Sequence, residues 1–310
     1  MIGRIGALAL NTFREAVRDR VLVALLAVAC GVLLFTLALA ELSLHEQRRV
    51  VHDVGLASIS LFAVVAAVFL GSSMLDKEIE RRTLYVILPK PVGRAELLLG
   101  KFAGIALTGW VFVGLMGGVQ LWVMALQAGV APLAVLAAVL GCGALLGLGL
   151  WRIRDRTALI VPWTVVVVLV ATLSAEAGGV PLTPVLGALA LTAAELCVLT
   201  AVALFFSSFS TPFLTGVLTV GVWILGRSAG QMATLKTRVL PEGVQAALRA
   251  LAHVVPNFQL YVPGRRALEV DFATAGGAWT YVAMAWAYGL AYAAALLVFA
   301  AFVFRRRDLP

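Results

Sequence analysis

The sequence contains few charged residues, few cysteines and few histidines. Among its 310 residues, 13% are charged and 62% are hydrophobic, whereas soluble domains average roughly 25% charged residues. The three cysteines, Cys30, Cys142 and Cys197, are isolated and lie in apolar runs, so no C-x-x-C metal or redox site is supported. This composition excludes an ordinary soluble protein and indicates an integral membrane protein.

Several catalytic motifs are also missing. No G-x-x-x-x-G-K-[ST] phosphate loop occurs, because Gly100-Lys101 is followed by Phe102 and Ala95 stands where the first Gly would be. H-E-x-x-H, paired intramembrane Asp and an acidic diphosphate-binding cluster are absent as well. His45 and His52 lie near acidic residues but lack the spacing of metal ligands. The sequence therefore predicts no catalytic residue, no metal site, no ATP hydrolysis and no cofactor on this chain.

Long apolar runs predict the membrane-spanning helices, because about 20 apolar residues cross a bilayer. Of the eight runs, the fifth is short and contains Pro162, and the seventh reaches full length only with flanking polar residues. The runs are Val21–Ala40, Val54–Leu75, Phe102–Leu126, Pro132–Trp151, Ala158–Ser174, Val185–Phe206, Phe213–Gly226 and Trp279–Phe304. The sequence predicts one all-α polytopic membrane domain over residues 1–310, with eight spans.

Most of the 24 Lys and Arg residues fall in alternate connections. They are Arg4, Arg14, Arg18, Arg20, the six within Lys77–Lys101, Arg152, Arg154, Arg156 and Arg305–Arg307. The positive-inside rule places these connections and both termini in the cytoplasm. The net charge of +8 then reflects anionic lipid headgroups rather than nucleic acid, because a basic groove with stacking aromatics is missing. Residues 1–20 predict an interfacial helix.

The cytoplasmic connection 76–100, here called the coupling region, is densely charged. Its predicted functional residues are Glu78, Glu80, Arg81, Arg82, Thr83, Pro89 and Arg94. Pro89 and Pro91 stop any helix that begins at Asp76, which predicts a short surface helix with a charged rim. Two interpretations remain: a docking surface, or a solvated loop that only enforces orientation. An orientation signal needs positive charge alone, and the acidic residues therefore favour docking.

Glu195 is an ionisable residue near the middle of the sixth span, where a charge is costly and usually faces protein or water. It could line a transport route or meet a donor such as Gln120 across a dimer, or it could be a protonated residue in a helix interface. The outer connection 230–277 predicts a short helix, because Val244, Leu248, Leu251 and Val255 share a face that ends at Pro256-Asn257. The residues interpreted as membrane-interface anchors are Trp110, Trp122, Trp163, Trp279 and Tyr281.

Four segments, taken in order, resemble the permease subunits of type-2 ABC exporters. They are the amphipathic start Asn11–Ala16, the coupling region with Arg82-Thr83, Leu88-Pro89 and Gly100-Lys101, the hairpin Leu204–Phe209, and the charged end Phe304–Leu309. The resemblance covers most of the chain. The family core has six spans, so Pro132–Ser174 would be an additional helical pair.

The resemblance implies a permease in the bacterial inner membrane that forms a homodimer or heterodimer and pairs with a separate ATP-binding cassette subunit, which binds ATP and Mg²⁺. ATP hydrolysis there would move the coupling region and switch the spans between two access states. Two alternatives are an ion- or proton-coupled secondary transporter, with Glu195 as the coupling group, and a membrane-embedded enzyme. The first needs inverted repeats, and the sequence shows no convincing one.

Overall fold

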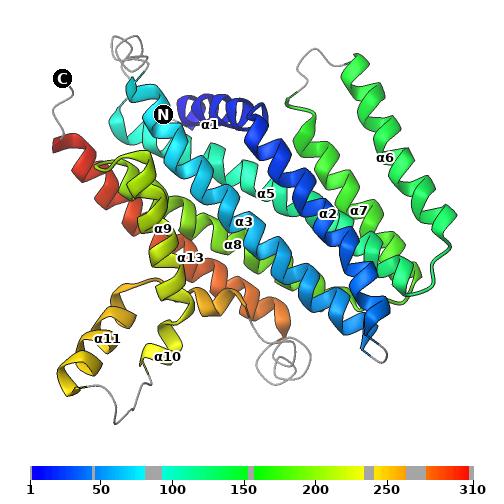
Figure 1. Ribbon diagram of the computed structural model, residues 1–310. Coiled ribbons are helices and arrows are strands. Elements are labelled where there is room, and N and C mark those ends of the chain that lie inside the picture. The colour runs from blue at the N-terminus through cyan, green and yellow to red at the C-terminus, as the bar shows by residue number, and fades with distance from the viewer. Residues whose placement is uncertain are drawn as a thin grey trace. The chain divides into compact units, whose positions relative to one another are not determined.

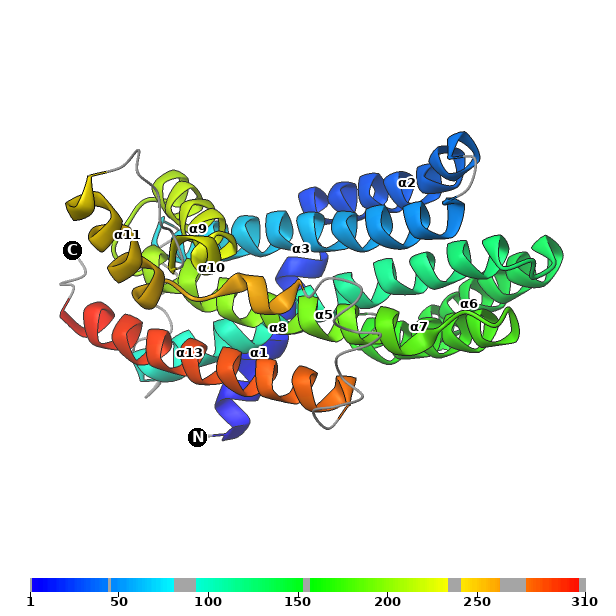
Figure 2. The same ribbon diagram turned by 90° about the horizontal axis from the view of Figure 1, so that it is seen from below.

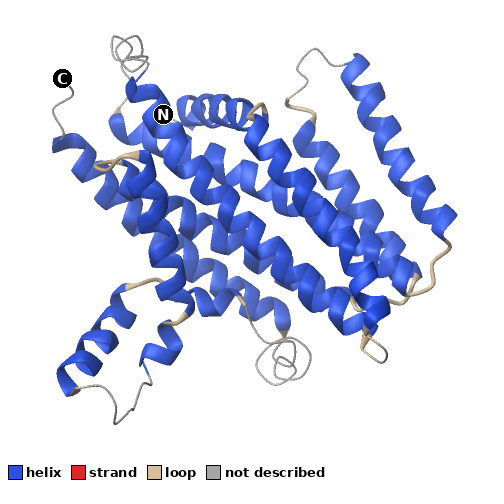
Figure 3. Cartoon of the chain, in the orientation of Figure 1, coloured by secondary structure: helices blue, strands red, loops and turns tan. Residues whose placement is uncertain are grey.

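A computed structural model describes residues 2–43, 46–80, 93–152, 157–233, 241–262 and 277–306, and every regular element in these ranges is a helix (Figures 1 and 3). The predicted all-α class is confirmed. In chain order the elements are α1 Ile2–Val17, α2 Arg20–Leu42, α3 Gln47–Glu80, α5 Arg94–Gln127, α6 Pro132–Arg152, α7 Ile160–Ala177, α8 Leu182–Ser207, α9 Pro212–Arg227, α10 Ala229–Ala233, α11 Glu242–Val254, the 3₁₀ helix η1 Phe258–Tyr261 and α13 Ala278–Arg306.

Seven helices among the described residues are long and apolar enough to cross a membrane: α2, α3, α5, α6, α7, α8 and α13. The fifth predicted span corresponds to α7, whose 18 residues are sufficient. The seventh corresponds to α9, which has 16 residues and is shorter than the roughly 20 that a full crossing needs. Of the eight predicted spans, seven therefore correspond to helices that are long enough to cross a membrane, and α9 is too short to cross alone.

Local signals explain where several helices begin and end. Asp19 lies between α1 and α2, and its side chain accepts a hydrogen bond from the Val21 amide at 3.0 Å, a standard N-cap. Pro132 and Pro212 are the first residues of α6 and α9, where a missing amide hydrogen costs nothing. Gly129 and Gly179 follow α5 and α7 with φ of 94° and 70°, and glycine adopts this left-handed conformation readily.

The chain forms two compact units, which are described separately. Unit 1 comprises Met1–Ala9, Ala67–Ala106 and Ala194–Pro310. Its helices approach closely at small residues: a Cβ added to Gly71 on α3 would overlap Ala203 on α8, and one added to Gly100 on α5 would lie 2.5 Å from the Leu8 Cβ on α1. Such small-residue contacts are a usual way of packing membrane helices.

A serine-rich hairpin joins α8 to α9 within unit 1. The Ser208 hydroxyl donates to the Phe205 carbonyl at 2.7 Å, and the Ser210 and Thr215 hydroxyls lie 2.8 Å apart. Ser207 and Ser208 are buried. These hydroxyls satisfy backbone groups where α8 ends, so the chain can reverse without leaving buried carbonyls unpaired.

Unit 2 comprises Leu10–Ala66 and Leu107–Ala193. In this unit α5 packs through glycines: a Cβ on Gly114 would lie 2.8 Å from Thr164 on α7, and one on Gly117 would lie 2.6 Å from Leu189 on α8. Helices α6 and α7 lie side by side (Figures 1 and 2). The Trp163 indole donates to the Cys142 carbonyl at 2.9 Å and ties this pair together.

Candidate functional site: a buried ion pair and an interrupted crossing

A buried ion pair joins α8 to α9 in unit 1. The Glu195 side chain is 1% exposed, and that of Arg227 is 25% exposed. Arg227 Nη2 donates to both carboxylate oxygens of Glu195, at 2.8 and 3.0 Å, and its Nε donates to Oε1 at 3.1 Å. Charge-assisted bonds of this multidentate kind are among the strongest that side chains form.

Trp223 completes this cluster. It lies one helical turn before Arg227 on α9, and its indole Nε1 donates to Glu195 Oε1 at 2.9 Å. The Arg227 guanidinium carbon lies 5.1 Å from the Trp223 ring centroid, within the range of a cation–π interaction. Arg227 and Trp223 therefore both donate to the Glu195 carboxylate. The two roles that the sequence leaves open for Glu195 stay predictions.

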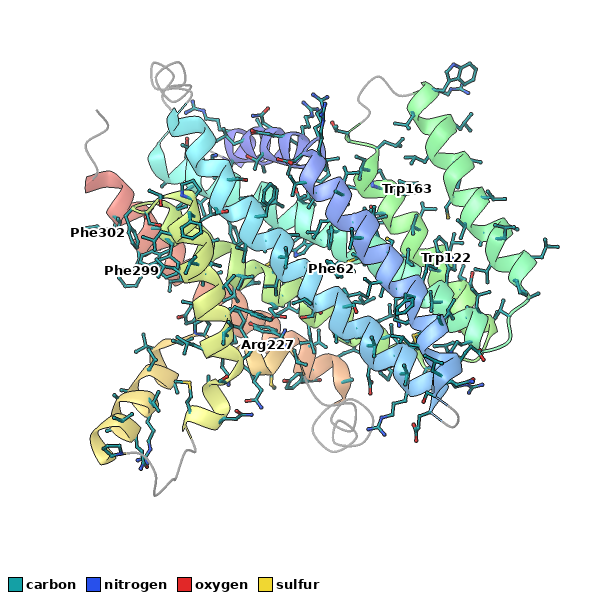
Figure 4. The ribbon with its side chains drawn as sticks, in the orientation of Figure 1. Phe62, Trp122, Trp163, Arg227, Phe299 and Phe302 are labelled. Carbon is teal, nitrogen blue, oxygen red and sulfur yellow. The ribbon has the colours of Figure 1, made fainter. Side chains whose placement is uncertain are left out.

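The pair lies near the middle of α8. This helix runs from Leu182 to Ser207, and at about 1.5 Å per residue Glu195 is about 18 Å from its end and about 20 Å from its start. Arg227 is the last residue of α9, and Figure 4 shows it near this end of the helix. Since α9 begins directly after the hairpin, it ends about halfway along α8.

The chain returns to α9 after α11. The segment Pro256–Val262, here called the returning segment, contains η1, and Phe258 and Tyr261 in it are 0% and 2% exposed. Gly226, beside Arg227, makes room for this segment, because a Cβ there would overlap the Phe258 ring and the Pro256 carbonyl oxygen. Gly230 on α10 likewise faces Gln259. The end of α9 and the returning segment are therefore in direct contact.

Hydroxyls of tyrosine hold the returning segment along α13. Three hydrogen bonds do this: Tyr281 Oη donates to the Leu260 carbonyl at 2.6 Å, Tyr261 Oη donates to the Ala285 carbonyl at 3.3 Å, and the Asn257 amide donates to Tyr288 Oη at 3.1 Å. Just before the segment, Tyr292 Oη donates to the carbonyl of Val254, the last residue of α11, at 2.8 Å. Tyr292 lies 14 residues into α13, about 21 Å from its start. The segment thus runs beside the first half of α13.

We interpret α9 and the returning segment as one membrane crossing made in two pieces, because α9 alone is too short to cross. Helix α9 would cover the first half, and the returning segment would cover the second half in an irregular conformation. Non-helical backbone at membrane depth is tolerated where protein groups satisfy it, and the tyrosine hydroxyls of α13 supply those groups. Broken helices of this kind are places where membrane proteins change conformation.

The second predicted residue, Gln120, lies in unit 2. It is fully buried on α5, and its Nε2 donates to the Val51 carbonyl on α3 at 2.9 Å. A Cβ on Gly55 would overlap its carboxamide. Within the chain, Gln120 therefore joins α3 to α5, while the partners of Glu195 are Arg227 and Trp223.

The coupling region is described in part. The backbone of α3 continues without a break from Gln47 to Glu80, and α5 begins at Arg94. Glu78 and Glu80 thus lie in the last turns of α3, and Arg94 is the first residue of α5; Arg81, Arg82, Thr83 and Pro89 lie outside the described residues. No helix break occurs at Asp76, so the charged residues up to Glu80 continue α3, and the rest of the predicted surface helix lies outside the described residues.

The sequence did not identify Arg227, which follows a short apolar run, or the hydrogen-bonding role of the α13 tyrosines, of which Tyr281 was interpreted as an interface anchor. Tyr281, Tyr288 and Tyr292 recur at intervals of seven and four residues, which places them on one helical face, and this spacing could have identified them. No group of three or more His, Cys, Asp or Glu that could hold a metal occurs among the residues that the structure describes.

The fold and the site define a polytopic helical membrane protein whose buried polar groups join helices rather than perform chemistry. The chain belongs to the ABC-2 family of transporter proteins, whose model matches residues 7–309. Members of this family are the non-catalytic membrane subunits of ABC transporters, and ATP is handled by a separate ATPase subunit. No protein of curated function matches the chain in sequence.

Proposed function

We propose that this ABC-2 membrane subunit is an exporter permease, that it works as a dimer, and that its coupling region docks on the ATPase subunit. Both termini then lie in the cytoplasm, as the distribution of Lys and Arg indicates. The family match supports the pairing with an ATPase. The resemblance of the amphipathic start Asn11–Ala16, the coupling region and the hairpin Leu204–Phe209 to type-2 exporters supports the direction of transport.

The continuity of α3 carries this proposal. Its apolar part, Gln47–Ser73, qualifies as a membrane span, and the helix then continues to Glu80. The 34 residues of α3 extend about 51 Å, beyond the roughly 30 Å of a hydrocarbon core. A displacement applied at Glu78 or Glu80 would therefore act on the same continuous helix that forms the span.

The contacts of Glu195 and the family match together favour this function over proton-coupled secondary transport. A proton-coupling carboxylate has to bind and release its proton during the cycle. Glu195 instead accepts four hydrogen bonds from Arg227 and Trp223, so both of its carboxylate oxygens have protein partners.

Replacement of Glu78 and Arg82 by Ala tests the docking proposal. The double variant is expected to retain the ATPase subunit roughly tenfold less in co-purification, a change of about 1.4 kcal/mol in binding free energy, with unchanged abundance in the membrane. Arg49 and Asp53 are a matched control, because this i,i+4 pair is 3.5 Å apart near the opposite end of α3. Undiminished co-purification of the Glu78/Arg82 variant would leave the region as an orientation signal only.

A further inference from the structure

Three contacts in unit 1 form a continuous chain from α8 to α13. Glu195 on α8 binds Arg227 at the end of α9, the neighbouring Gly226 contacts Phe258 and Pro256, and the returning segment is hydrogen-bonded to Tyr281 and Tyr288 of α13. Each contact fixes the next one. A rotation or withdrawal of the end of α9 would therefore remove the surface against which the returning segment lies.

An ion pair is an unusual contact between two buried helix surfaces such as those of α8 and α9. A buried pair costs several kcal/mol per ion in desolvation, and well-packed apolar residues of the same volume are often as stabilising or more so. Its multidentate geometry, however, restricts both the depth and the rotation of α9. Apolar contacts alone would fix the depth of α9 less strictly. A full-length span is positioned by the match between its length and the bilayer thickness, and α9 is too short for such a match.

We propose that Glu195 and Arg227 are positioning residues for the returning segment: the pair sets the end of α9, and through Gly226 it holds Phe258 against solvent within the interrupted crossing. The inference deepens the proposed transport function by naming the residues on which closure of this part of the path depends. Loss of the pair then opens the returning segment, while the other helices of the unit stay folded.

The test uses the full-length chain with Cys30, Cys142 and Cys197 replaced by Ala and with Phe258→Cys as a reporter. Phe258 is 0% exposed, so with the pair intact the thiol is expected to resist a membrane-impermeant maleimide. Glu195→Gln removes the charge at nearly constant volume and is expected to raise the labelling rate at least about tenfold, which corresponds to about 1.4 kcal/mol in the opening equilibrium.

Two further variants separate positioning from general damage. The exchange Glu195→Arg with Arg227→Glu keeps both charges and should restore most of the protection, which a merely misfolded unit would not recover. Arg227→Lys keeps the charge, loses the multidentate contact and should give an intermediate rate. If the charge exchange lowers the amount of protein in the membrane, the labelling rate of the Arg227→Lys variant still tests the proposal.

Gly226→Ala should expose the thiol with the pair intact, because its Cβ would overlap the Pro256 carbonyl; Gly221→Ala on the same helix, with nothing within 4 Å of the added Cβ, should not. Protection that persists in both Glu195→Gln and Arg227→Lys would overturn the proposal. Labelling is measured without ATP and without the ATPase subunit, so its outcome is independent of the docking test above.

Discussion

Gln120 is fully buried in unit 2, and only one end of its carboxamide has a partner. Its Nε2 donates to the Val51 carbonyl at 2.9 Å, whereas its Oε1 has no hydrogen-bond partner among the described residues. An unsatisfied buried acceptor costs about 1–3 kcal/mol. Close packing therefore helps to fix the Gln120 side chain, and Gly55 on α3 leaves the space that its carboxamide occupies.

Gly55→Ala should consequently destabilise unit 2. The added Cβ would overlap the Gln120 carboxamide, and moving that group would break its bond to Val51. Overpacking of this kind costs about 1–3 kcal/mol, which should appear as a lower thermal midpoint of the detergent-solubilised protein. Gly31→Ala on α2 is the control, because nothing lies within 4 Å of its added Cβ. Equal midpoints for the two variants would show that Gln120 can move without cost.

At this scale the sequence identified polar residues but not their partners. Glu195 was evident as a single charge in an apolar run, yet its partner Arg227 is 32 positions away, and no pattern links the two. Trp110 and Trp163 were interpreted as interface anchors, but their indoles donate to the Ala193 and Cys142 carbonyls of neighbouring helices at 3.2 and 2.9 Å. Such contacts depend on helix packing, which hydropathy does not specify.

Among the elements, α1 contacts α5 beside the coupling region. At Gly100 the two helices approach closely: an added Cβ would lie 2.5 Å from the Leu8 Cβ and 3.4 Å from the Ile5 carbonyl oxygen. Gly100 lies six residues after the start of α5 at Arg94. The first half of α1 therefore packs directly on α5, the helix that follows the coupling region.

Gly100→Ala is expected to displace the first half of α1. The overlap involves the Leu8 Cβ, which cannot rotate away as the end of a long side chain could. Hydrogen exchange of the α1 amides should therefore become faster by about tenfold, because fewer contacts keep them closed. Gly6→Ala, whose added Cβ meets nothing within 4 Å, should leave the exchange unchanged. Equal exchange in both variants would mean that α1 is held by other contacts.

The existence of most elements could be predicted, because long apolar runs have few other solutions. Their limits were harder to predict. The charged residues from Asp76 onward mark the edge of the membrane, but α3 continues to Glu80 because charge alone does not end a helix. The returning segment was assigned to the outer connection, since the tyrosines of α13 that bind its backbone lie far along the chain.

For the whole molecule, we expect eight crossings, of which the seventh would be made by α9 and the returning segment together. Both termini would then lie on the same side, as the distribution of Lys and Arg predicts. The pair α6 and α7 does not change this parity, because an extra pair that crosses twice preserves the orientation of everything after it. Arg152, Arg154 and Arg156 favour a cytoplasmic connection between these two helices.

Single cysteines at the two ends of α7 test this topology in the cysteine-free chain. Asp155→Cys keeps all three Arg residues of its connection and should resist an impermeant thiol reagent added from outside, whereas Ala177→Cys should react. Ala177 is exposed and is preferable to Gly178, where a Cβ would lie 2.9 Å from Val130. Reaction at both sites would mean that α6 and α7 enter and leave on the outer side. The core would then contain six crossings, with α9 and the returning segment as one of them, and the termini would keep the same orientation because removing a pair does not change parity.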